Sequence, residues 1–439
     1  MAALIGMSLA SYVWMVSNAA IAATRSLAWN GAIPILEAGA EEALTQLEYN
    51  DINHLAANKW KDLGNGWFCK SRNVDQTSYY EVMIKQVEPP IIVTTGYVPA
   101  PLAPSAPFGM VPGSIVPATS PNPGLYVKRR VRMDTARKPI FPCAMLAKGR
   151  IDLAGNHVTT DGFDSSDPLY STLGKYDRTR IKASGDVQTN SRDKNAINVG
   201  NADIMGRAGN GAGGTVKVGS QGSVGDLNWA KGGNHDIEKG WISEDVNIQI
   251  DDVEVPFTAG YTTPISGRVG ANSYTYVLNG AENEYYKLSQ FGGNVYVIGN
   301  VILLVTDKFE FAANDYIYIA PGGTLKVYVA APTAKIGGRG IINSDGYAAN
   351  FQYYGLPTNK ELNVGGNAAF TGAIYAPEAS FTISGGGNND YDFVGACVVS
   401  RVRLAGHVHF HFDEALRKTY WKGYVVTAWN ELDPNAAVE

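Results

Sequence analysis

The segment MAALIGMSLASYVWMVSNAAIAAT, residues 1–24, decides the fold class because it contains no charged side chain, and the first charge is Arg25. An apolar helix of about 20 residues is long enough to cross a bilayer. This segment is rich in alanine, serine, glycine and asparagine, and small residues let helices approach one another closely. In a signal peptide a basic region precedes the apolar run, and this segment shows no such region. The sequence therefore predicts a helix that packs among other helices, with a simple membrane anchor or a long core helix as alternatives.

The helical pattern continues beyond Thr24 to about Tyr49, which predicts one long helix over residues 1–50. Such a helix is roughly 70 Å long, far more than a bilayer needs. Gly31 and Pro34 interrupt the pattern, and because proline removes a backbone donor we expect a kink or a locally melted turn there. The apolar residues that recur at three- and four-residue spacing are Trp29, Ile33, Leu36, Ala40, Ala43, Leu44 and Leu47.

The run ATRSLAWNGAIPILEAGAEEALTQL, residues 23–47, resembles the second half of the N-terminal helix in type IV pilin-like and minor-pilin-like proteins. In that family a stretch such as AAEAGIEEAL leads from the helix into a β domain. Many members carry a glutamate near the start of the helix, where this chain has Leu4, Ile5 and Gly6. The resemblance implies a bacterial structural subunit that waits in the inner membrane and then assembles with identical subunits into an extracellular filament. The residues expected to make the helix–helix contacts are Met1, Leu4, Ile5, Leu9, Tyr12, Val13, Val16, Ile21, Leu27, Trp29 and Pro34.

The composition limits the other classes of function. Only 18% of the 439 residues are charged and the net charge is −5, so a general affinity for nucleic acid has no electrostatic support. The 49 glycines and 24 tyrosines favour a β-rich chain with many turns. Cys69, Cys143 and Cys397 allow at most one disulfide and exclude a cysteine-rich metal module.

Residues 51–145 predict a small β region that contains a proline-rich arm, residues 98–124. The density of proline forbids regular strands over most of the arm. A free linker would be more polar, so we expect the arm to dock on a neighbouring subunit, with a solvent-exposed linker as the alternative. The side chains expected to dock are Leu102, Phe108, Met110, Val111 and Ile115.

From Leu146 onward, short β-type runs end at glycine, asparagine or aspartate without any helical period. This texture predicts a parallel, right-handed β-helix in two segments, residues 146–255 and 291–412, with a β-sandwich as the alternative. Residues 256–290 break the rhythm and predict an insertion or hairpin, and residues 413–439 a C-terminal tail. The run GNAAFTGAIYAPEASFTISGGG, residues 366–387, resembles the β-helical domain that follows pilin-like helices in bacterial surface proteins. The predicted fold class is α+β.

Two clusters carry residue types that bind metals. His407, His409 and His411 alternate along one predicted strand, so they share a face at roughly 6.5–7 Å spacing and suit Zn²⁺ or Cu²⁺ if a fourth ligand converges. A packed or solvent-facing histidine row is the simpler interpretation. Asp161, Asp164 and Asp167 have the character of a Ca²⁺ loop without EF-hand spacing, and Asx-turns explain them equally well.

No motif in the sequence demands catalysis. Gly-x-Ser-x-Gly and His-Glu-x-x-His are missing, and the glycine runs do not lie between a strand and a helix as phosphate-binding loops do. We therefore expect a protein without enzymatic activity or a required cofactor. The alternative is a β-helical enzyme or adhesin that the N-terminal helix tethers to a membrane and that acts on polysaccharide or surface glycans.

Overall fold

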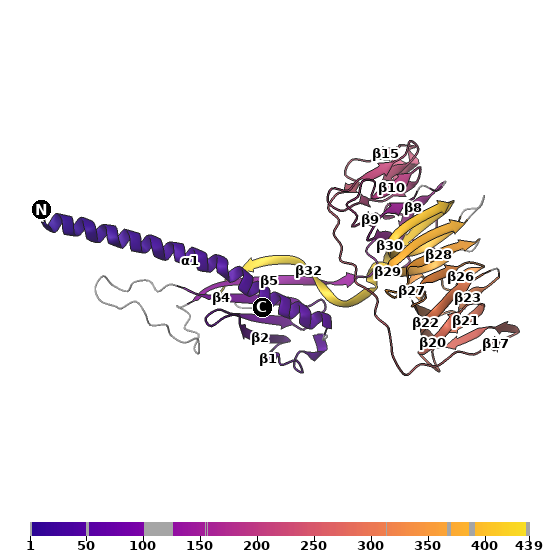
Figure 1. Cartoon of the computed structure of the whole chain (residues 1–439), viewed down its shortest axis with the longest axis horizontal. Helices are drawn as coiled ribbons and strands as arrows, with labels where there is room; N and C mark the ends of the chain where they lie inside the picture. Colours follow the sequence, from indigo (N-terminus) through magenta and orange to yellow (C-terminus); the bar gives the residue numbers. More distant parts are fainter. Residues whose placement is uncertain are drawn as a thin grey trace. The chain divides into compact units, whose positions relative to one another are not determined.

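The computed structural model describes residues 2–49, 52–100, 126–153, 155, 157–312, 314–366, 370–385 and 391–435. The chain divides into two compact units (Figure 1). Unit 1 consists of residues 1–138 and 420–439, and unit 2 of residues 139–419. A long N-terminal helix precedes a chain made mostly of strands, so the predicted α+β class is confirmed.

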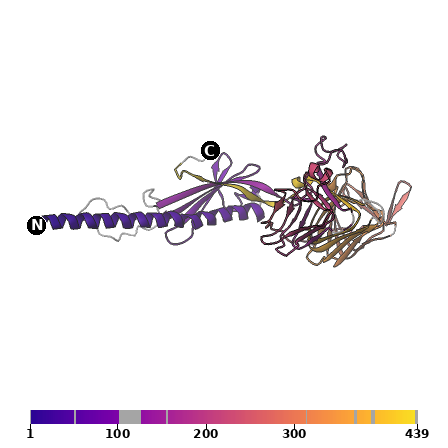
Figure 2. The same ribbon diagram turned by 90° about the horizontal axis from the view of Figure 1, so that it is seen from above.

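Unit 1 packs the helix α1 (Ala2–Tyr49) against a six-stranded sheet, with the short helix η1 (Ile52–His54) after it. Each of the first five strands pairs antiparallel with the next strand in the chain. In sheet order the strands are β1 (Lys61–Gly64), β2 (Trp67–Asn73), β3 (Tyr79–Lys85), β4 (Ile91–Pro99), β5 (Tyr126–Pro139) and β32 (Tyr420–Leu432). Figure 2 shows α1 running along the sheet and continuing beyond it.

The helix α1 is continuous from Ala2 to Tyr49, so of the kink or locally melted turn expected at Pro34 the melted turn is not present. Tight packing on the sheet holds it together on both sides of the proline. A Cβ on Gly96 of β4 would lie 2.6 Å from the carbonyl oxygen of Ala32, so only glycine permits this approach. The hydroxyl of Thr94 donates a hydrogen bond of 2.9 Å to the carbonyl oxygen of Leu36.

The last part of the chain is not a tail, as the sequence analysis expected. The strand β31 (Val408–Asp413) and the helix η3 (Glu414–Lys418) belong to unit 2, and β32 returns to the sheet of unit 1. Unit 2 is therefore inserted between two strands of unit 1. The two ends of the insertion meet, since the amide of Ile140 donates to the carbonyl oxygen of Thr419 at 2.8 Å.

Unit 2 contains most of the strands. Its first part comprises β6 (Met145–Ala147), β7 (Ile151–Asp152), β8 (Thr159–Phe163), β9 (Val187–Thr189), β10 (Ile197–Gly200), β11 (Asp203–Met205), β12 (Ala208–Gly209), β13 (Val216–Val218), β14 (Ser223–Gly225), α2 (Leu227–Lys231), β15 (Asp236–Ile237) and β16 (Ile242–Ser243). Its second part comprises β17 (Gly267–Val269), β18 (Asn272–Tyr274), β19 (Tyr276–Asn279), β20 (Tyr285–Phe291), β21 (Asn294–Ile298), β22 (Asn300–Phe311), β23 (Tyr316–Ile319), β24 (Thr324–Val329), β25 (Thr333–Ile336), β26 (Gly340–Asn343), η2 (Ala348–Asn350), β27 (Phe351–Gly355), β28 (Glu361–Gly366), β29 (Phe370–Gly385), β30 (Tyr391–Gly406) and β31.

Strands of unit 2 pair in parallel with strands that come later in the chain, and often not with the next strand. In the first part, β6 pairs with β9, β9 with β12 and β7 with β10, all in parallel. The pairings join 20 strands into one sheet, and β19, β21, β23 and β26 form a second, parallel sheet. Among the described named strands of unit 2, antiparallel pairing is confined to β17 and β18, whereas a β-sandwich consists mainly of antiparallel pairs.

The segment predicted as an insertion is shorter than residues 256–290. Only the hairpin β17–β18 leaves the stack, because β19 already pairs in parallel with β21 and β20 with β22. Within residues 256–290 aromatic side chains pack together, and the ring centroids of Phe257 and Tyr285, for example, lie 5.3 Å apart.

In-register parallel pairing places like residues above one another in the core of unit 2. Phe370, Phe393 and Phe410 occupy equivalent positions on β29, β30 and β31, and successive ring centroids lie 4.5 and 4.4 Å apart. Close approach requires glycine at Gly395, whose φ is +145°, because a Cβ at this position would lie 1.7 Å from the carbonyl oxygen of Gly372.

The three cysteines, Cys69, Cys143 and Cys397, are all free thiols.

Candidate assembly helix and histidine cluster

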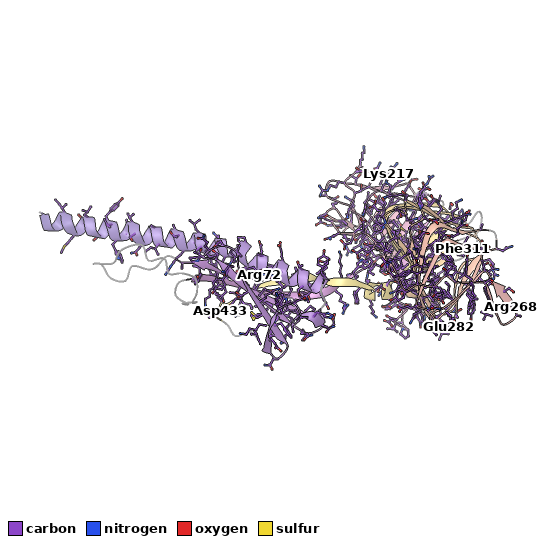
Figure 3. The ribbon with its side chains drawn as sticks, turned by 60° about the horizontal axis from the view of Figure 1, so that its bottom comes forward. Arg72, Lys217, Arg268, Glu282, Phe311 and Asp433 are labelled. Carbon is purple, nitrogen blue, oxygen red and sulfur yellow. The ribbon has the colours of Figure 1, made fainter. Side chains whose placement is uncertain are left out.

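The N-terminal half of α1, residues 5–27, exposes large apolar side chains, although folded chains normally bury such residues. Figure 3 shows its side chains projecting from several sides of the helix. Among the predicted assembly residues, the exposed fractions are 63% for Ile5, 63% for Leu9, 61% for Tyr12, 58% for Val13, 48% for Val16 and 72% for Leu27. Ile21 is half-buried, Met1 lies outside the described residues, and Leu4 is helical.

The C-terminal half of α1, residues 28–47, buries its apolar stripe against the sheet of unit 1. Leu36, Ala40, Ala43 and Leu47 pack with residues of β3, β4 and β5 in one apolar core. Trp29 lies under the guanidinium of Arg129, which is 4.9 Å from the ring centroid. Pro34, the last of the predicted assembly residues, is exposed.

Ion pairs also fix this half of the helix. Glu42 pairs with Lys70 at 3.0 Å and with Arg72, labelled in Figure 3, at 2.7 Å. The hydroxyl of Tyr80 donates to the same carboxylate. Burial, followed by this hydrogen bond, raises the pKa of Tyr80, so the phenol stays protonated and remains a donor.

By length and composition α1 qualifies as a membrane-spanning helix, with a mean hydropathy of 1.3 over its most apolar window. A signal sequence or the core helix of a soluble protein passes the same test. The exposure of the window distinguishes it from a core helix, because none of the window is buried by the chain. The described part of the chain therefore leaves the apolar surface of residues 5–27 uncovered.

The residues predicted to dock from the proline-rich arm, Leu102, Phe108, Met110, Val111 and Ile115, lie outside the described residues. The docking of the arm stays a prediction.

Of the three predicted histidines, His409 and His411 lie on β31 and share a face, whereas His407 precedes the strand. The rings of His409 and His411 are parallel within 2° and their centroids are 6.3 Å apart. The row is not arranged as a metal site. His407 packs beside His157, with ring centroids 5.1 Å apart, and Nδ1 of His409 lies 2.6 Å from the hydroxyl of Thr159.

His411 is 1% exposed and both of its ring nitrogens contact carboxylates. Nδ1 lies 2.7 Å from Oδ1 of Asp161 on β8, and Nε2 lies 3.3 Å from Oδ1 of Asp392 on β30. The ring of Tyr176 stacks on the imidazole at 3.7 Å, and its hydroxyl donates to Oδ2 of Asp161 at 2.9 Å. We call these four residues the His411 cluster.

The charges in the His411 cluster stabilise one another. Burial disfavours the imidazolium, but the hydrogen bonds with Asp161 and Asp392 outweigh it and raise the pKa of His411 above its usual value. The hydrogen bond with His411 lowers the pKa of Asp392 despite partial burial. Burial raises the pKa of Tyr176, so its hydroxyl remains a donor to Asp161. The His411 cluster is therefore a hydrogen-bonded network in the interior of unit 2, in which the two carboxylates favour the protonated imidazole.

Asp161, Asp164 and Asp167 do not converge. Asp161 belongs to the His411 cluster, while Asp164 accepts from the amide of Ser166 at 2.9 Å and Asp167 from the amide of Leu169 at 2.9 Å. These are Asx-turns, the alternative to a Ca²⁺ loop that the sequence left open. Within the residues that the structure describes, no three His, Cys, Asp or Glu side chains come together as metal ligands.

Sequence reasoning missed Asp392 and Tyr176. A usable signal for Asp392 existed, because parallel pairing aligns Asp392 with His409 and Val394 with His411, one turn of chain apart. Once a stacked fold is assumed, residues separated by one turn become neighbours. Tyr176 comes from a loop and carried no such signal.

A concavity of unit 2 has a volume of about 660 Å³. Its one carboxylate, Asp413, is 1% exposed and accepts hydrogen bonds from the amide and the hydroxyl of Ser165 at 3.0 and 2.7 Å. A glycosidase site needs a pair of carboxylates that face the substrate. The residues that line this concavity do not supply a pair.

Comparisons with known proteins add little to this picture. Residues 293–419 match the family described as "Domain of unknown function (DUF7305)". No curated protein matches the chain. The crystal structure of the competence-associated pilin ComZ from Thermus thermophilus aligns over 92% of this chain and 98% of its own, at 10% identity and a TM-score of 0.22. A TM-score this low establishes no common fold, so no property of that pilin is carried over.

Proposed function

We propose that this chain is the structural subunit of an extracellular, pilus-like bacterial filament, in which the N-terminal halves of α1 bundle in the core and the β domains lie outside. The observation that carries the proposal is the contrast along α1. Residues 28–47 are packed on their own sheet, whereas residues 5–27 leave apolar side chains such as Trp14, 66% exposed, without cover.

Exposed apolar surface costs about 25 cal/mol for each Å² left in water. A bilayer removes this cost before assembly, and copies of the same helix remove it afterwards. Alanine, serine and glycine along residues 2–24 favour the second partner, because they let helices pack closely. Copies that pack head to tail use two different surface patches, and such an interface gives an open fibre when the rotation between copies does not close into a ring.

For unit 2 we propose a parallel, right-handed β-helix with a display or structural role, without enzymatic activity and without a cofactor. The parallel pairing of strands one turn apart supports the coil, and parallel crossovers are right-handed in nearly all proteins. The commitment of His411 to two carboxylates supports a structural role for the histidines. The net charge of −5 argues against nucleic acid as a partner.

The test is electron microscopy of the full chain, extracted from membranes in detergent and then dialysed. We expect long fibres of uniform width, and we expect a chain that lacks residues 2–24 to remain monodisperse. A full chain that stays monomeric in vesicles under conditions that favour assembly overturns the filament and leaves a tethered enzyme or adhesin. Cleavage or binding of polysaccharide by that monomer distinguishes these two.

A further inference from the structure

The charged residues of α1 are distributed in a way that its own fold does not use. Arg25 is the first charge of the chain, and the next are Glu37 and Glu41. All three side chains are exposed. Within the described residues none of them takes part in an ion pair, whereas Glu42, one position further on, binds Lys70 and Arg72.

The three charges lie on opposite sides of the helix. An α-helix turns by about 100° per residue, so Arg25 lies about 20° from Leu36 and thus on the side of α1 that faces the sheet further along the helix. Leu36 is 1% exposed, which fixes that side. Glu37 and Glu41 lie about 120° and 160° from Arg25. They therefore occupy the side that faces away from the sheet.

This arrangement suits head-to-tail packing of a helix that uses two different faces. If the filament of the proposed function forms, Arg25 enters a bundle of apolar segments and loses its water. A desolvated guanidinium is tolerated when it is paired with a carboxylate. The side of one projecting half that carries Arg25 then meets the side of a neighbouring α1 that faces away from its sheet, and that side carries Glu37 and Glu41.

We propose that Arg25 of one copy forms an ion pair with the Glu37–Glu41 face of the next copy and thereby sets the stagger between them. The inference rests on the proposed function, and its partner is a second copy of this chain. Arg25 and Glu41 are separated by about 24 Å along the helix axis at 1.5 Å per residue. Neighbouring copies that touch through this pair are therefore shifted by about one such distance.

A charge exchange tests the pair. The variant Arg25→Glu presents only carboxylates at the three positions, and the variant Glu37→Arg/Glu41→Arg presents only guanidiniums. We expect each variant alone to form at least 10-fold fewer fibres than the unchanged chain. We expect an equimolar mixture of the two to form fibres, because every contacting pair then holds one copy of each. The variant that carries all three substitutions should also assemble.

Arg192→Glu, an exposed charge reversal of the same type in unit 2, is the matched control and should assemble like the unchanged chain. Circular dichroism of each variant before assembly checks that it is folded. If the unchanged chain forms fibres but the mixture and the triple variant do not, or if either single-sign variant assembles normally, the ion pair is wrong while the filament stands. If the unchanged chain forms no fibres, the filament fails and the ion pair with it.

Discussion

The N-terminal half of α1 and the His411 cluster treat opposite kinds of side chain in opposite ways. In α1, Val13 and Trp14 are apolar and remain 58% and 66% exposed. In unit 2, His411 and Asp161 are ionisable and are 1% and 3% exposed. The first region places apolar groups in water and the second places charged groups in the interior, and both arrangements cost free energy unless a partner compensates.

The difference lies in where the partner comes from. The His411 cluster is compensated within the chain, since Asp161, Asp392 and Tyr176 satisfy the imidazole. Nothing in the described part of the chain covers residues 5–27 in the same way. The His411 cluster is therefore satisfied within one copy of the chain, whereas the apolar surface of residues 5–27 is left uncovered by the described residues.

The largest effect is expected from Val13→Lys. A lysine at this position places a charge in the apolar bundle once per copy, and desolvating it costs several kcal/mol. We expect fibre formation to be abolished, while the thermal unfolding of the detergent-solubilised chain is unchanged because Val13 contacts no core. The matched control is Val74→Lys at a position of similar exposure, 48%, after β2, which should assemble normally. Normal fibres from the Val13 variant would mean that residues 5–27 are not buried by assembly.

His411→Ala should have the reverse effect, with lower stability of unit 2 and unchanged assembly. The substitution leaves Asp161 buried without its cation, and breaking a buried ion pair in this way costs about 3 kcal/mol or more. Denaturant unfolding monitored by tryptophan fluorescence measures the loss. His235→Ala removes an exposed histidine of the same unit and should change stability by less than about 0.5 kcal/mol. A His411 variant as stable as the unchanged chain would show that the cluster is not an ion pair.

The pH dependence of unit 2 sharpens this comparison. The pKa of His411 is raised from 6.5, so its contribution is complete below pH 6.5 and is lost as the pH rises through the higher, folded value. The pKa of Asp392 is lowered from 3.8, so its contribution is complete above pH 3.8 and is lost as the pH falls through the lower, folded value. The cluster is therefore most stabilising between these pH values. His411→Gln should flatten the decline in unfolding free energy above pH 6.5, and a decline that persists would place its origin elsewhere.

Much of the fold could be predicted from the sequence because it depends on local patterns. The uncharged run of residues 1–24 and the apolar stripe to Leu47 predict α1, and glycine-closed runs predict the stacked strands. Of the two outcomes expected at Pro34, a kink or a melted turn, the melted turn was wrong because local propensity was judged without the sheet, where Gly96 and Thr94 contact the helix backbone. The return of β32 to unit 1 pairs segments separated by the whole of unit 2, and no local pattern reports such a pairing.

The candidate sites divide in the same way. The common face of His409 and His411 follows from the two-residue period of a strand and was predictable. The ligand of His411 was not, because Asp161 reaches it from β8, far away in the sequence. A metal was the chemical interpretation of three histidines in a row, but the register supplies carboxylates from both neighbouring strands instead.

The smallest effect is expected where the two halves of α1 meet, from Pro34→Ala. Proline in a helix interior lacks an amide hydrogen and crowds the carbonyl of the preceding turn, and relative to alanine it costs about 3 kcal/mol. Pro34 is exposed, so the substitution removes no core contact. The sheet has already imposed helical geometry on residues 32–36, which means that part of this cost is spent in the folded state and is recovered by alanine. We expect a gain of about 1–2 kcal/mol in the unfolding free energy of unit 1, below the full host–guest value because proline also restricts the unfolded chain.

Thermal unfolding of the full chain measures the gain. Thr45→Ala, at an exposed position further along the same face, is the control for a change in helix propensity alone. A loss of stability in the Pro34 variant, with no change in the control, would show that the packing of α1 on Gly96 depends on the local geometry that proline imposes. In that case the division between the exposed and the packed half of the helix is set at Pro34 itself, and fibre formation should weaken along with the stability of unit 1.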